Sequence, residues 1–188
     1  MNKDKLVVGG ILLTKSNSLI SKIIRWFMVK YRKNLGLKSA EVYSHGGTII
    51  DVWGELHIAE ALAGGITITP VVEAYGKYDL SNLKFRAPRK PYSKTEQALV
   101  SQLAVQSAST RYDFFGLFWQ IQRVSWAQNS TDPNWNGPTG STAEKREYCT
   151  EFCATLANKV RPNTFKEPWA ANPVDVDINQ YYIDTDIS

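Results

Sequence analysis

Two cysteines and two histidines carry most of the chemistry that the 188-residue sequence offers. Cys149 and Cys153 are four residues apart and form no disulfide framework. Together with His45 and His57 they are too few and too dispersed for a zinc site of usual spacing, and no metal site is expected. A cysteine and a histidine can instead act as a pair, in which the imidazole takes the thiol proton and the thiolate attacks a carbonyl carbon. Such a pair normally needs a third polar group that fixes the orientation of the imidazole.

The strands that carry the histidines indicate which one has such a group beside it. Segments 41–51 and 55–62 flank a Trp53-Gly54 turn and predict a β-hairpin. With a two-residue turn, His45 and Glu60 fall on the same face as diagonal neighbours, roughly 7–8 Å apart at the backbone. His57 points to the opposite face, so the predicted register pairs His45 with Glu60. A slip of one residue would reverse this choice.

Each of these residues also has a structural interpretation. A single histidine in a strand is more often a structural residue than a catalytic one. A cysteine on the apolar stripe of a helix is usually a small core hydrophobe. Glu60, between two alanines, could be an ordinary surface carboxylate. Taken alone, none of the three residue types establishes catalysis.

The elements around these residues predict an α+β fold. Strands are expected in the first half of the chain and helices in the second, apart from one early helix at 16–33, and this order is typical of α+β rather than α/β proteins. The expected strands are 5–14, 41–51, 55–62, 66–69 and 83–87, and the expected later helices are 93–109, 112–128 and 147–160. Residues 129–142 are rich in turn formers and predict a loop. We expect one domain over residues 1–188, a small antiparallel sheet or barrel packed on helices.

The composition is that of a globular protein. Hydrophobic residues make up 43% and charged residues 21% of the chain, which argues against disorder and coiled coil. No apolar run approaches the ~18 residues of a membrane-spanning helix, and residues 1–10 lack the pattern of a signal peptide. We therefore expect a soluble, cytoplasmic protein. No phosphate-binding loop or dinucleotide fingerprint occurs, and no cofactor is expected.

Positive charge is concentrated at the N-terminus. Residues 1–40 contain nine Lys and Arg against one Asp, a balance of +8, so the other 148 residues sum to −4. This asymmetry indicates either a solvated basic face or an anionic partner such as a lipid surface. In helix 16–33, we expect five apolar residues to pack on the strands and four basic ones to point outward, with Trp26 and Met28 flanking the apolar stripe and partly exposed. The expected buried set is Leu19, Ile20, Ile23, Ile24 and Phe27, and the expected outward set is Lys22, Arg25, Arg32 and Lys33.

Four short motifs follow one another along the chain, and their order and spacing are more specific than any one of them alone. They are Gly9-Gly-Ile-Leu-Leu-Thr14 followed by Ser18–Trp26, Tyr43-Ser-His-Gly-Gly47, Ala59-Glu-Ala61 followed by Gly65–Thr69, and Tyr148-Cys-Thr-Glu-Phe152. In order and spacing the chain resembles the circularly permuted papain-like cysteine hydrolases of the NlpC type, the YiiX-like group. The resemblance spans residues 8–178. Two positions depart from it: Gly10 stands where the family usually has Asp, and Thr150 where it has Ser.

The resemblance implies roles for individual residues. Cys149 would be the nucleophile, His45 the general base and Glu60 the orienting group, with Cys153 in the core. Tyr43 and Tyr31 are our candidates for donors to the oxyanion. The role of Cys149 requires its helix to begin near Tyr148, where the helix dipole lowers a thiol pKa. Ser141 and Glu144 offer a competing capping box that would begin the helix near Thr142.

Two functions of different classes follow. The first is a thiol hydrolase or acyltransferase that acts on a peptide, amide or lipid-acyl substrate through an acyl-enzyme. The alternative is a non-catalytic module of the same fold that binds an anionic surface, such as a membrane, through the basic N-terminal helix. Nucleic acid is not expected, because the aromatic residues are not interleaved with Lys and Arg on a recognition element.

Overall fold

The computed structural model describes residues 2–38, 40–76, 78–109, 111–112, 146–166, 168 and 171–188. The predicted loop 129–142 and almost all of the predicted helix 112–128 lie outside the described residues. Tyr112, where that helix was expected to begin, lies in a two-residue strand.

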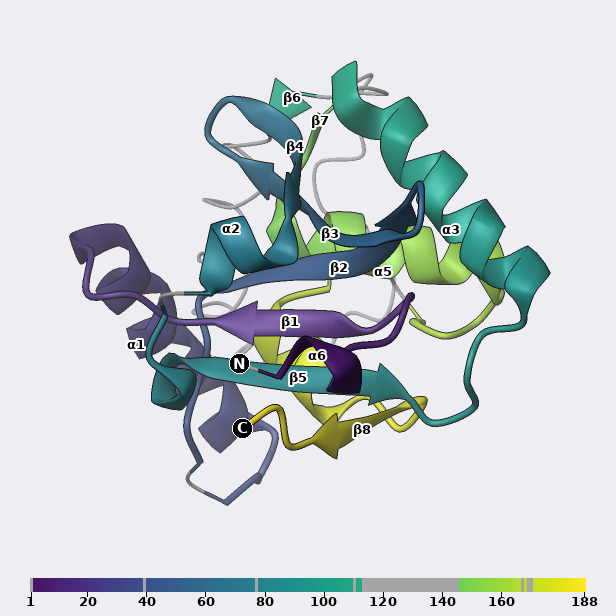
Figure 1. Cartoon of the computed structure of the whole chain (residues 1–188). Coiled ribbons are helices and arrows are strands. Elements are labelled where there is room, and N and C mark those ends of the chain that lie inside the picture. Colours follow the sequence, from purple (N-terminus) through teal and green to yellow (C-terminus); the bar gives the residue numbers. More distant parts are fainter. Residues whose placement is uncertain are drawn as a thin grey trace.

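An antiparallel sheet of six strands, in the order β4-β3-β2-β1-β5-β8, forms the centre of the described structure (Figure 1). The strands are β1 (Ile11–Thr14), β2 (His45–Val52), β3 (Glu55–Leu62), β4 (Gly65–Pro70), β5 (Leu83–Pro88) and β8 (Tyr182–Thr185). A short parallel pair, β6 (Arg111–Tyr112) and β7 (Arg146–Glu147), lies outside this sheet. With helices packed against the sheet, the predicted α+β architecture is confirmed.

Helices cover both faces of the sheet. They are α1 (Leu19–Asn34), α2 (Val71–Tyr75), α3 (Lys94–Gln106), α5 (Cys149–Val160) and α6 (Pro173–Ile178). On one face Ile50 packs with residues of α3 and α5, while its neighbour Ile49 packs on the other face with residues of α2. This alternation is the expected consequence of the two-residue period of a strand. None of the described helices is both long and apolar enough to cross a bilayer.

The predicted β2–β3 hairpin has the predicted register. Val52 pairs with Glu55, Ile50 with His57 and Thr48 with Ala59. The turn has two residues, Trp53 and Gly54, with φ of 54° and 85°. Positive φ at both positions matches the twist of the flanking strands, and this explains why so short a loop fixes the register.

The orientation of α1 differs from the prediction. Leu19, Ile20 and Ile23, which we expected to be buried, are 73%, 65% and 43% exposed. Met28, expected at the edge of the stripe, is 2% exposed. Ile24 is buried, as predicted, whereas Phe27, also expected to be buried, is only partly so; both pack with Met28 near Val174 of α6.

The cause is that α1 contacts α6 rather than the strands. The buried row of the helix is Ser21, Ile24 and Met28, spaced by three and four residues. Ser21 is buried although it is polar, because its hydroxyl is hydrogen-bonded to that of Ser44 at 2.6 Å. The basic residues also differ in part from the prediction. Lys22 and Lys33 are exposed, but Arg25 is half-buried and Arg32 forms an ion pair with Asp177 at 2.8 Å.

Candidate active site

Cys149 is the first residue of α5, which places its thiol at the N-terminal end of a helix. The residues just before it, Arg146–Glu147, form β7, so the alternative start near Thr142 is wrong. The Glu151 carboxylate accepts a hydrogen bond from the backbone N–H of Tyr148 at 3.3 Å and so caps this helix end. Cys149 therefore lies where the helix dipole favours a thiolate.

Close contact between α5 and β2 sets the position of the sulfur. The Thr150 hydroxyl donates to the Ala171 carbonyl at 2.8 Å and ties the first turn of α5 to the segment before α6. On the strand side, a Cβ added to Gly46 would lie 3.2 Å from Thr150 Cγ2, so a glycine allows this close approach. Hydrogen bonding from the backbone of Gly46 and of Thr150 lowers the pKa of the Cys149 thiol.

The side chains of His45 and Glu60 are in contact beyond the point at which β2 and β3 stop pairing. The pairing of β2 with β3 ends at Thr48 and Ala59. Beyond it, His45 lies opposite Thr14 of β1, while Glu60 lies opposite Thr67 of β4. The His45 imidazole Nε2 and Glu60 Oε2 are 2.7 Å apart and are hydrogen-bonded. The two residues singled out by the hairpin register are therefore in direct contact.

A tyrosine that sequence reasoning missed lies behind the carboxylate. The Tyr75 hydroxyl, at the end of α2, donates to Glu60 Oε2 at 2.7 Å. Burial, followed by the charge and hydrogen bond of Glu60, raises the pKa of Tyr75 well above its usual value, so the phenol stays protonated and donates. A smaller, opposing effect comes from the Thr14 side chain, whose hydrogen bonding lowers the pKa of Tyr75. No local pattern in residues 71–75 marks Tyr75, because it reaches Glu60 only through the tertiary fold.

The Cys149 thiol and the His45 imidazole each shift the pKa of the other, through their charges and a side-chain hydrogen bond. Burial raises the pKa of Cys149, but the charge and hydrogen bond of His45, together with hydrogen bonding from the backbone of Gly46 and Thr150, lower it below its usual value. Burial lowers the pKa of His45, whereas the Cys149 thiolate and the hydrogen bonds to Cys149 and Glu60 raise it to about 10. The pair therefore favours the thiolate–imidazolium form, and this form has the nucleophilic sulfur that acyl transfer needs.

The fold has a counterpart among solved structures. The chain is similar to the crystal structure of metalloprotein YiiX from Escherichia coli O157:H7. The similarity has a TM-score of 0.63 and 15% sequence identity, and covers 97% of each chain. No family model matches the chain, and no curated protein matches it. At this identity, the similarity to YiiX shows the fold alone.

YiiX is described as a metalloprotein, and a metal centre would need several ligating side chains that converge on one ion. Glu60 is hydrogen-bonded to Nε2 of His45, and Cys149 interacts with the same imidazole. Within the described part of the sequence, no group of three or more His, Cys, Asp or Glu side chains could hold a metal ion. The donor set does not fit a metal centre.

The other residues singled out in the sequence lie elsewhere. The Tyr43 hydroxyl donates to Glu41 at 3.3 Å, and the Tyr31 hydroxyl donates to Asp175 at 3.0 Å. Cys153 is buried in an apolar cluster with Tyr43, as predicted for a core residue. His57 Nδ1 is hydrogen-bonded to the backbone carbonyl of Glu55 at 3.0 Å, within its own strand. Of the residues considered from sequence, Cys149, His45 and Glu60 are therefore brought together.

Proposed function

We propose that this chain is a cysteine hydrolase or acyltransferase that acts on an amide or ester through a thioester acyl-enzyme. The observation that carries the proposal is the continuous hydrogen-bonded chain from Cys149 through His45 to Glu60. Nucleophile, base and orienting carboxylate are arranged in the order that nucleophilic catalysis requires. Their order along the sequence, with the histidine before the cysteine, also suits a permuted papain-like domain.

In this mechanism the Cys149 thiolate attacks the substrate carbonyl carbon and a C–S bond forms. Negative charge moves to the carbonyl oxygen, where the Cys149 backbone N–H at the helix start is a suitable donor. The Gly46 N–H, which already donates to the sulfur, is the better candidate for the second donor, because carboxylates hold the hydroxyls of Tyr43 and Tyr31. The His45 imidazolium gives its proton to the leaving group as the C–N or C–O bond breaks.

The second half of the reaction regenerates the enzyme. His45, now neutral, takes a proton from water or from an acceptor alcohol or amine, whose oxygen or nitrogen attacks the thioester carbonyl. The C–S bond breaks and Cys149 leaves as the thiolate, while His45 keeps the proton it has taken, so the thiolate–imidazolium pair is restored. Attack by water gives hydrolysis, and attack by an acceptor gives acyl transfer. Peptide amides and lipid acyl groups are both within this chemistry.

Labelling with thiol-directed acyl and peptidyl probes, mapped by mass spectrometry, tests the proposal. We expect one labelled site at Cys149 in the folded protein, lost in Cys149→Ala and strongly reduced in His45→Ala. Cys153→Ala is the matched control and should label as the wild type does. A module that only binds a surface would show slow reaction at both buried thiols with no dependence on His45, and that outcome would overturn the proposal.

A further inference from the structure

One side of α1 exposes apolar and basic side chains together. We call this side the α1 face, and its members are Leu19, Lys22, Ile23, Trp26, Val29, Lys30 and Lys33, all exposed. Spacings of three and four residues place these side chains on neighbouring rows of one side of the helix. The helix contains no Asp or Glu. The face is therefore apolar and positively charged along its length.

Contacts on the opposite side of α1 keep this face turned outward. Ser21 is hydrogen-bonded to Ser44, and Arg32 forms an ion pair with Asp177 in which both side chains are largely buried. These contacts lie near the two ends of the helix, so α1 cannot roll to bury Leu19 or Ile23 without breaking them. Because the fold holds these apolar side chains at the surface, their exposure indicates an interaction site.

The chemistry of the face favours a lipid surface over a protein partner. The cores of protein–protein interfaces are depleted of lysine, yet Lys22, Lys30 and Lys33 run along the whole face. A long lysine side chain can lay its methylene stem on an apolar layer and keep its ammonium in the headgroup region. The Lys30 ammonium lies 3.5 Å from the centre of the Trp26 ring, which pairs a cation with the aromatic residue most typical of membrane interfaces.

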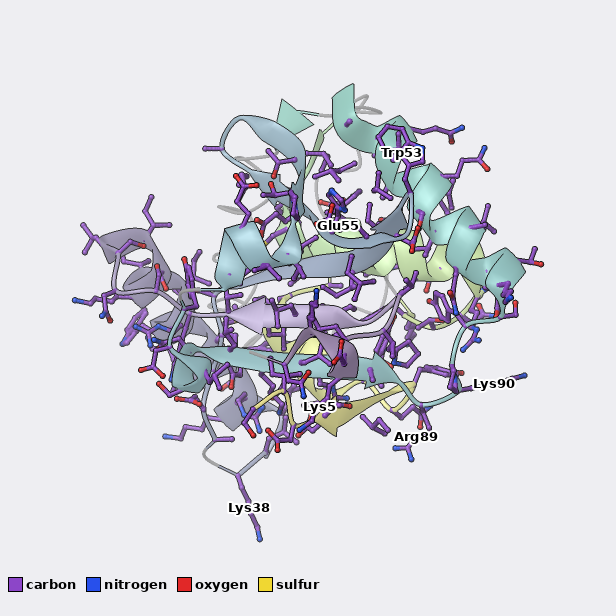
Figure 2. All side chains as sticks on the ribbon, viewed as in Figure 1. Lys5, Lys38, Trp53, Glu55, Arg89 and Lys90 are labelled. Atoms are coloured by element: carbon purple, nitrogen blue, oxygen red, sulfur yellow. The ribbon has the colours of Figure 1, made fainter. Side chains whose placement is uncertain are left out.

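We propose that the α1 face docks this protein on an anionic lipid bilayer, with the helix lying in the plane of the interface. Leu19, Ile23 and Trp26 would enter the boundary between headgroups and acyl chains, and the lysines would contact lipid phosphates. Lys38, in the segment after α1, adds an exposed cation on the same side of the molecule (Figure 2). Lys90 and Arg89 lie on the other side, far from α1 (Figures 1 and 2).

Docking through α1 would also bring the candidate active site close to the bilayer. Ser44, which holds the N-terminal part of the helix, directly precedes His45. This consequence rests on the proposed function: an acyl-transferring thiol beside a docked helix would meet substrates presented by the membrane. The docking itself does not depend on the chemistry.

Co-sedimentation with lipid vesicles tests the proposal. The full chain should bind vesicles of phosphatidylcholine with about one-third phosphatidylserine at about 0.1 M salt, and bind far less at about 1 M salt. Vesicles of pure phosphatidylcholine should bind it only weakly. No binding to the anionic vesicles at the lower salt concentration would overturn the proposal.

Paired variants identify the surface that binds. Lys22→Glu with Lys33→Glu should lower the partition coefficient about thirtyfold or more, since each lysine near the surface contributes about fivefold. Leu19→Ser with Ile23→Ser should weaken binding at both salt concentrations. The matched control is Lys90→Glu with Lys94→Glu, which changes net charge equally at two exposed positions away from α1 and should keep its binding.

Three further outcomes decide the interpretation. An equal loss in the control pair would mean that net charge alone drives adsorption and would overturn the assignment to α1. A dimer in light scattering that Leu19→Ser with Ile23→Ser abolishes would show that a second copy covers the face, which also overturns it. Cys149→Ser should bind vesicles as the wild type does, because it leaves the α1 face unchanged. Vesicle binding therefore tests the docking proposal, and thiol labelling tests the proposed chemistry independently.

Discussion

The Tyr75 hydroxyl and the Glu60 carboxylate form a buried hydrogen bond of 2.7 Å, on the same oxygen that accepts from His45. Both residues are nearly inaccessible, with 6% and 5% of their surface exposed. A buried carboxylate is costly unless donors satisfy it, and here two donors converge on Oε2. In the proposed mechanism Tyr75 is therefore a positioning residue, which acts on Cys149 only through Glu60 and His45.

Tyr75→Phe should slow alkylation of Cys149 several-fold, because the carboxylate that orients His45 loses one of its restraints. The lost hydrogen bond to a charged group should also lower the free energy of unfolding by about 1–3 kcal/mol. Iodoacetamide kinetics and urea unfolding measure the two effects.

Tyr78→Phe is the matched control for this variant. Tyr78 packs against the Tyr75 ring at 4.8 Å and is more exposed, so its hydroxyl should matter little. In a Glu60→Gln background, Tyr75→Phe should slow alkylation no further, since the two residues act in one chain. Equal effects of both tyrosine variants, or fully additive effects with Glu60→Gln, would contradict the positioning role.

The part of the site that depends on local geometry could be predicted from the sequence. A two-residue turn fixed the register of β2 and β3, and the register placed His45 beside Glu60 rather than His57. Cys149 lies about a hundred residues further along the chain, and no local sequence pattern predicts that it contacts His45. The order of the motifs, and not their individual chemistry, pointed to it.

Two features could not be predicted because tertiary contacts decide them. Tyr75 lies in a five-residue helix with no periodic signal, and only the fold brings it to Glu60. In α1, the spacing of the apolar residues predicted that the row with the largest side chains would be buried. The buried row instead contains Ser21, whose hydrogen bond to Ser44 satisfies its hydroxyl and lets a polar residue occupy a contact position.

Cys149 should be the one fast-reacting thiol. The imidazolium of His45 lowers the pKa of Cys149, and each unit of pKa lowering raises the thiolate population about tenfold below that pKa. Alkylation near pH 7 should therefore be rapid at Cys149 and slow at Cys153, which lies in an apolar cluster. His45→Ala should slow Cys149 about tenfold or more, while Cys153→Ala leaves its rate unchanged. Faster labelling of Cys153 would count against this interpretation.

The His45 imidazole should keep its proton well into the alkaline range. Its pKa is raised to about 10, mainly by the Cys149 thiolate and then by Glu60, against the opposing effect of burial. NMR of the imidazole protons should show His45 titrating near pH 10, with His57→Gln assigning the signals of the two histidines.

Glu60→Gln removes the negative charge that favours imidazolium, so the midpoint of His45 should move to lower pH. Cys149→Ser removes the larger of the two influences and should move it further in the same direction. A midpoint near the ordinary histidine value in the wild-type protein would show that the thiolate–imidazolium pair does not form.

Gly46 lies where β2 contacts the first turn of α5, and its lack of a side chain allows the two to pack closely. In Gly46→Ala the new Cβ would lie 3.2 Å from Thr150 Cγ2 and 3.3 Å from Leu13 Cδ2, so the neighbours must move by a few tenths of an ångström. The Gly46 N–H, which donates to the Cys149 sulfur, would move relative to the helix end. We expect alkylation of Cys149 to slow several-fold and the free energy of unfolding to fall by about 1–3 kcal/mol.

Thr150→Ser separates this steric effect from a general loss of stability. It removes the methyl group that the new Cβ meets but keeps the hydroxyl that donates to the Ala171 carbonyl. Alone it should cost about 1 kcal/mol for the lost methyl. In combination with Gly46→Ala, the space of the missing methyl accommodates the added one. The double variant should therefore react faster at Cys149 than Gly46→Ala alone. Strictly additive effects in a double-mutant cycle would show instead that the strain falls on Leu13, and that Thr150 does not set the distance between the helix and the strand.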